Sequence, residues 1–159
     1  MSTKHQRMQN LIRHYRDVTG KSEVNMKDVA KFAFENGWKL PDPVSPLDRL
    51  AKEFSQAARE EIKHDHSTGN PYRVNHVVTT KQGEIQLHLW YDIDVAQREP
   101  MLKSFISRRE QMVGDGLQLT FDADHWNNIH PEESPIIIPM DFTEDIEERK
   151  HAPVLDEAA

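Results

Sequence analysis

The sequence contains no cysteine, which excludes a disulfide framework and any metal site built from thiolates. It also lacks a run approaching the about 18 apolar residues of a membrane-spanning helix, and its polar first residues do not form a signal region. We therefore expect a soluble, cytoplasmic protein without membrane contacts. The motifs GxSxG, GxGxxG and the phosphate-binding P-loop are absent too, so we name no catalytic residue and no cofactor, and the sequence favours a protein that is not an enzyme.

The formal net charge of −7 argues against a general nucleic-acid-binding protein, but the charge is unevenly distributed. Residues 1–113 hold 18 Lys/Arg and 15 Asp/Glu, a net charge of +3. Residues 114–159 hold 2 Lys/Arg and 12 Asp/Glu, a net charge of −10. The acidity therefore belongs to the last third of the chain, and the preceding part can still bind a polyanion.

A long amphipathic helix is predicted for Ser45–Asp65. Ser45 is a good N-cap, Pro46 suits the first helical position, and the negative charge of Asp48 suits the first turn. Apolar residues at spacings of three and four then predict one buried side of the helix. These residues are Leu47, Leu50, Ala51, Phe54, Ala58 and Ile62.

The opposite side of this helix carries polar side chains that we call the basic stripe. They are Arg49, Lys52, Gln56, Arg59 and Lys63. One interpretation is a solvated face on which neighbouring charges pair along the helix, as Asp48 and Lys52 would. The other is a DNA-binding face, because guanidinium groups can bridge guanine edges, glutamine can pair with adenine, and lysine can neutralise phosphate.

Two shorter helices and a β-hairpin flank the long helix. The first helix is expected from about Gln6 to Thr19, with Gly20 as its C-cap. The second is expected to begin after the N-cap Asn25 and to end at Gly37. After Gly69 the apolar period changes to two, which predicts strands at 72–79 and 84–91 joined by a turn at 81–83. His76 and His88 are expected to face each other across this pair.

Three helices followed by a hairpin resemble the winged helix-turn-helix class over residues 6–92. In that class the third helix enters the major groove of DNA and the hairpin, or wing, lies along the backbone. The resemblance therefore implies contacts from Arg49, Lys52, Gln56 and Arg59, with Arg73 and Lys81 on or beside the wing. Together with Lys63, these seven residues are the predicted DNA-binding set.

The remaining chain is predicted to form an extension on this α+β core. A basic helix is expected from about Glu99, loosened by Gly114 and Gly116, and it serves either as a dimerisation helix or as a lid. Residues 117–121 form a short strand or continue the helix, and Ile136–Ile138 between two prolines suggests an edge strand. Asp141 and Glu144 resemble a capping box that begins an acidic helix at 142–150.

These elements predict three parts: a winged-helix-like domain at 1–93, a mixed extension at 94–150 packed on it, and a disordered tail at 151–159. No metal site is expected. The best candidate ligands are Asp122, Asp124, His125 and His130, with Asp115 as a further member, but their spacing matches no defined metal-binding loop.

Three hypotheses on function follow. The first is a protein that binds double-stranded DNA, such as a dimeric transcriptional regulator. The second is a protein–protein interaction module whose acidic C-terminal region binds a basic partner or covers the domain's own basic face. The third is a small metal-dependent enzyme built around Asp122 and His125.

Overall fold

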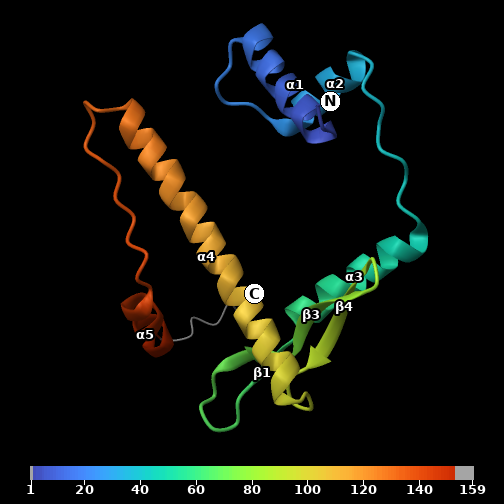
Figure 1. The fold of residues 1–159 in the computed structure, drawn as a ribbon, viewed down its shortest axis with the longest axis vertical. Coiled ribbons are helices and arrows are strands. Elements are labelled where there is room, and N and C mark those ends of the chain that lie inside the picture. The colour runs from blue at the N-terminus through green and yellow to red at the C-terminus, as the bar shows by residue number, and fades with distance from the viewer. Residues whose placement is uncertain (1, 153–159) are drawn as a thin grey trace. The chain divides into compact units, whose positions relative to one another are not determined.

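The computed structural model describes residues 2–152 and consists of helices and small antiparallel sheets, as expected for an α+β chain (Figure 1). The chain divides into two compact units, and the division falls between Glu53 and Phe54. The predicted domain boundary after residue 93 stays a prediction, and the end of the predicted tail, 153–159, lies outside the described residues. The elements are α1 (Lys4–Thr19), α2 (Met26–Glu35), α3 (Pro46–Glu60), β1 (Ile62–His64), β2 (Pro71–Arg73), β3 (Asn75–Gln82), β4 (Ile85–Asp92), α4 (Arg98–Ile129) and α5 (Thr143–His151).

The first unit is built on the packed pair α1 and α2. Helix α1 begins two residues before its predicted start, because Thr3 and Gln6 form a capping box that satisfies two backbone N–H groups. Gly20, with φ of 68°, ends α1 as predicted, and its N–H donates to the carbonyl of Arg16. The aromatic edge contact between Tyr15 and Phe32, at 5.4 Å between ring centroids, joins the two helices.

Helix α3 begins as predicted, but its apolar side is not buried. The Ser45 Oγ accepts a hydrogen bond from the Asp48 N–H at 3.1 Å, which confirms the N-cap. The prediction that the apolar side forms part of a core is wrong, since Leu47 is 76% exposed and Phe54 is 68% exposed. Helical periodicity fixes which residues share a side, but it does not supply a partner to cover them.

The predicted end of the third helix at Asp65 is wrong, because the chain leaves the helix at Glu60 and turns into a small hairpin. Strand β1 pairs antiparallel with β2, with Lys63 opposite Tyr72. The Asp65 carboxylate accepts hydrogen bonds from the Ser67 and Thr68 N–H groups, and these bonds lower its pKa. An aspartate whose carboxylate accepts from the backbone N–H groups that follow it favours a tight turn of the chain over continuation of the helix.

Strands β3 and β4 form the predicted hairpin, but with a shorter turn. The pairing continues to Gln82 and Ile85, so the turn is Gly83–Glu84 rather than residues 81–83. Gly83 has φ of 64°, a conformation that glycine adopts readily. The expectation that His76 faces His88 is wrong, because His76 lies opposite Tyr91 and His88 lies opposite Thr79.

The core of the second unit lies where α4 crosses β3. Val78 and Met101 are buried on these two elements, together with the polar residues His76 and Ser104, and Val74 is buried just before β3. Both polar groups are satisfied, since the His76 Nε2 donates to the carbonyl of Arg73 at 2.8 Å and the Ser104 Oγ donates to that of Val77 at 3.0 Å. Within residues 2–152, no helix combines the length and the apolar character needed to cross a membrane.

Helix α4 passes through Gly114 and Gly116 without a break and includes residues 117–121, so of the two alternatives the continued helix is correct. The chain then returns along α4 in an extended stretch, and the predicted edge strand at Ile136–Ile138 is wrong (Figure 1). The Asn127 amide takes the place of a strand partner, because it accepts from the N–H of Ile136 at 2.8 Å and donates to its carbonyl at 2.9 Å.

The last helix, α5, begins close to its predicted position without the predicted capping box. Its N-cap is Phe142, which makes no side-chain cap hydrogen bond. Asp141 lies one residue earlier. The side chain of Thr143 and then its N–H, which donates at 3.0 Å, lower the pKa of this carboxyl through hydrogen bonds. The acidic first turn, with Glu144 and Asp145, suits the positive end of the helix dipole.

Candidate nucleic-acid interface

Four of the five residues of the basic stripe lie on α3. Arg49, Lys52, Gln56 and Arg59 are all exposed on the side opposite to Leu47 and the other apolar residues. Gln56 is not free, because its amide donates to the Glu60 carboxylate at 2.5 Å. On α3 the stripe therefore consists of three exposed cations and the neutral Gln56, beside the acids Asp48, Glu53 and Glu60 of the same helix.

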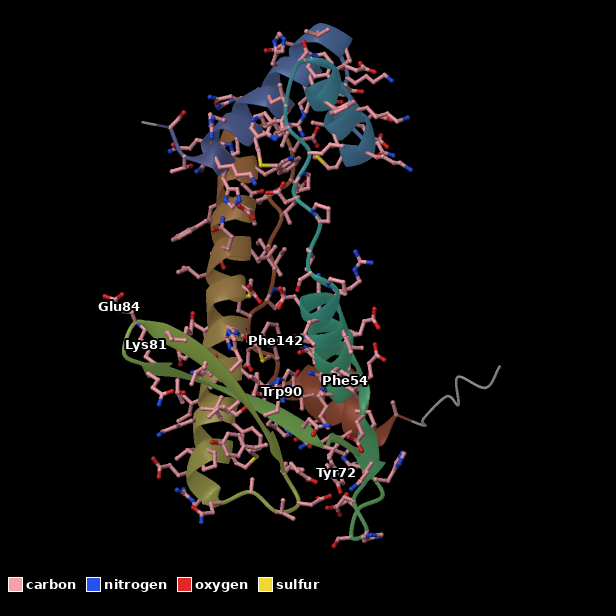
Figure 2. The ribbon with its side chains drawn as sticks, turned by 90° about the vertical axis from the view of Figure 1, so that its right-hand side faces the viewer. Phe54, Tyr72, Lys81, Glu84, Trp90 and Phe142 are labelled. Atoms are coloured by element: carbon pink, nitrogen blue, oxygen red, sulfur yellow. The ribbon has the colours of Figure 1, made fainter. Side chains whose placement is uncertain are left out.

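The end of α3 is fixed to the β3–β4 hairpin. The Asn75 side-chain amide donates to the carbonyl of Ala58 at 3.2 Å and to the Glu61 carboxylate at 2.8 Å. The guanidinium of Arg59 lies 5.3 Å from the centre of the Trp90 ring in a cation–π contact. Trp90 projects from β4, as Figure 2 shows. The last turn of α3 and the hairpin thus form one local arrangement.

Lys63 is not part of the helical stripe, because it lies in β1. Its Nζ is 3.2 Å from the Asp94 carboxylate, and the Tyr72 hydroxyl donates to the same carboxylate at 2.9 Å. The hydrogen bond from Tyr72 and then that from Lys63 lower the pKa of Asp94, while the bond to Asp94 raises the pKa of both partners. This cluster, Lys63–Tyr72–Asp94, connects the small β1–β2 hairpin to the end of β4.

The cluster should give the second unit a defined dependence of stability on pH. The carboxyl of Asp94 has a lowered pKa when folded, so its contribution is complete above the unfolded pKa and is lost as the pH falls through the folded value. Tyr72 and Lys63 have raised pKa values, so their contributions are lost as the pH rises through the folded values, above about pH 10.

We therefore expect the small difference in unfolding free energy between the wild type and Asp94→Asn to be constant from about pH 5 to about pH 9. It should shrink on both sides of this range. Urea unfolding at a series of pH values measures it, and Asp92→Asn, which removes a neighbouring carboxylate, is the control. A difference that is the same at pH 3 and pH 7 would contradict the role of Asp94.

The two remaining residues of the predicted DNA-binding set lie on strands. Arg73 ends β2 and is exposed, while Lys81 lies near the tip of the β3–β4 hairpin opposite Gln86. Figure 2 shows Lys81 and Glu84 together at this tip, so the cation has an acidic neighbour. The seven predicted residues therefore lie on α3, on the β1–β2 hairpin and on the β3–β4 hairpin. One of them, Lys63, forms an ion pair with Asp94.

Sequence reasoning missed Trp90, Asn75 and Asp94, which hold this region together. The alternation of side chains along β4 could have indicated the role of Trp90. It places Trp90 on the face opposite to Leu89 and Tyr91, where Trp90 can contact another element. Asn75 and Asp94 carry no such signal, since their partners come from other elements of the fold.

The candidate metal ligands do not assemble. Asp122, Asp124 and His125 lie on α4, and His130 is the C-cap of that helix. Successive helical residues are separated by about 100°, so Asp122 and Asp124 point to different sides of the helix. Within the part of the chain that the structure describes, no three His, Asp or Glu residues lie close enough to hold a metal ion.

Comparisons with protein-family models, with curated proteins and with solved structures gave no match to this chain.

Proposed function

We propose that this chain binds double-stranded DNA through α3 and the β3–β4 hairpin, as a regulator or another DNA-binding module would. The observation that carries the proposal is the exposed row Arg49–Lys52–Arg59 on a helix whose last turn is fixed to a hairpin. In the winged helix-turn-helix arrangement, a helix and a hairpin bind the groove and the backbone together. Lys81 near the hairpin tip supplies a cation for phosphate in the same way.

The net charge of residues 1–113 supports the same proposal. The +3 net charge of residues 1–113 favours a polyanion, while the −10 of residues 114–159 opposes one. Each phosphate that a cation neutralises releases counterions, so the affinity should fall steeply as salt concentration increases. Removing residues 141–159 should leave DNA binding unchanged or make it stronger.

The direct test is binding of a fluorescent duplex, measured by anisotropy at salt concentrations from low to physiological. The pair Arg49→Ala and Arg59→Ala should weaken binding about tenfold or more, since each guanidinium can form a bidentate contact with guanine. Arg49→Ala with Lys52→Ala is a second variant that keeps the Arg59–Trp90 contact and should give a smaller logarithmic slope with salt.

The matched control is Arg108→Ala with Arg109→Ala, which removes the same charge from α4. This control should retain wild-type affinity to within about twofold, because the effect depends on position and not on net charge. Equal loss in the control and in the α3 variants would leave only nonspecific electrostatic attraction. Unchanged binding in the α3 variants would overturn the proposal.

A second candidate function is a protein–protein interaction through the acidic C-terminal region. It is favoured by the exposure of Phe142 and Ile146 on or beside α5, next to the acids Glu144, Glu147 and Glu148. Under this function, removal of residues 141–159 abolishes binding of a basic partner, whereas under the DNA-binding function the same truncation preserves duplex binding.

A further inference from the structure

The first unit contains an open groove that the DNA-binding proposal does not use. It has a volume of about 960 Å³, and the described residues that line it all lie between Lys4 and Asp42. Helices α1 and α2 form two sides, and the segment that follows α2 forms the third. Most of the lining is apolar: Met8, Leu11, Ile12, Met26, Val29 and Phe34.

A reversal of the chain after α2 creates the third side. Gly37 adopts φ of 86°, and the N–H of Trp38 donates to the carbonyl of Ala33 at 2.9 Å. Trp38 is consequently half-buried, while Leu40 two residues later is 67% exposed. The groove is therefore lined by a half-buried aromatic ring and by an exposed aliphatic side chain.

The charges on the groove are mainly positive. Lys4, Arg7 and Lys39 line it, and Asp42 is the single acidic residue among the described residues of the lining. The guanidinium of Arg7 lies 5.9 Å from the centre of the Trp38 ring, so one cation is held directly beside the apolar lining. An occupant that combines apolar groups with negative charge fits this arrangement.

We propose that this groove binds an acidic amphipathic helix of a partner protein. The helix would insert apolar side chains at spacings of three and four and place Asp or Glu beside Lys4, Arg7 and Lys39. An extended peptide is a poorer fit because residues 2–53 contain no strand to which it could add. Met8 and Met26 suit this use, since the flexible thioether adapts to different apolar partners.

The test is selection from a display library of helical peptides, about 18 residues long so that a peptide spans several helical turns. The bait is the full chain. We expect the enriched peptides to combine an apolar stripe with several Asp or Glu residues. The best peptide should lose at least tenfold in affinity when its acids are changed to Lys, measured by fluorescence polarisation.

Leu40→Asp is the groove variant, and Val44→Asp is its matched control. Both replace an exposed aliphatic side chain in the same connecting segment, at 67% and 59% exposure, but only Leu40 lines the groove. We expect Leu40→Asp to weaken peptide binding at least tenfold and Val44→Asp to leave it unchanged. This experiment uses no DNA, so its outcome is independent of the proposed function.

Several results would overturn the proposal: no enrichment, enrichment of basic peptides, or equal affinity of wild type and Leu40→Asp. A synthetic peptide of residues 141–152 is included because it is acidic and carries Phe142 and Ile146. If it binds the groove as tightly as the best library peptide, the occupant is the acidic segment of this chain itself, and the assignment to a partner protein is wrong.

Discussion

Replacing Met101 with alanine is expected to lower the free energy of unfolding of the second unit by about 3 kcal/mol. Met101 is buried on α4, which packs on β3, and the core of this unit is small. Removing its side chain loses apolar burial and leaves a cavity, and both effects destabilise the fold. Because few side chains are buried here, the residues around position 101 can do little to fill the cavity.

Amide hydrogen exchange at β3 measures this loss directly, since the opening free energy of these amides reports the stability of the packing of α4 on β3. Leu102→Ala is the matched control, because it removes a side chain of similar size from the adjacent position, where it is 40% exposed. The control should cost less than about 1 kcal/mol. Equal costs at the two positions would contradict the packing of α4 on β3.

Replacing Ser104 with leucine is expected to destabilise the packing of α4 on β3 by about 3 kcal/mol, through overpacking and the loss of a hydrogen bond. Ser104 is 2% exposed, and its hydroxyl donates to the carbonyl of Val77. A small polar residue permits the close approach of helix and strand, and a larger side chain would have to push them apart.

Ser104→Ala separates the two effects. It removes the hydrogen bond without adding bulk, so it should cost about 1 kcal/mol. Exchange at the amides of β3 again provides the measurement. If leucine is tolerated as well as alanine, the space around residue 104 is larger than the structure gives, and the close contact between α4 and β3 is wrong.

The sequence predicted those features that depend on neighbouring residues. The caps at Gly20, Asn25 and Ser45 were predicted because each is a local hydrogen bond or a local backbone conformation. The β3–β4 hairpin was predicted from its alternation and its glycine, although the turn was misplaced because Lys81 and Gln82 extend the pairing.

The errors arise where a nonlocal or competing interaction decides the structure. Lys63 has helical spacing with Arg59, but the turn built on Asp65 and the ion pair with Asp94 place it on a strand. Gly114 and Gly116 suggest a helix end. The helix continues nevertheless, because the flanking helix-forming residues offset a cost in helix stability of about 1 kcal/mol for each glycine.

The candidate interface was predicted in part. Arg49, Lys52 and Arg59 share one exposed side of α3, as helical periodicity requires. The contact of Arg59 with Trp90 could not be predicted, because it depends on how the hairpin packs against the end of the helix. The exposure of Phe54 was missed for the same reason, since no local pattern reveals a missing partner.

The paired bonds between Asn127 and Ile136 make the length of the intervening loop a structural parameter. The side-chain amide of Asn127 on α4 bonds to the backbone of Ile136, so the residues between them form a closed ring. A change in loop length that shifted this pairing by one residue would leave α4 intact, but it would displace every later residue by one position relative to the helix. Met140, which lies beside Gly116, would lose that neighbour. Spacing, more than residue type, therefore sets where the acidic end of the chain runs.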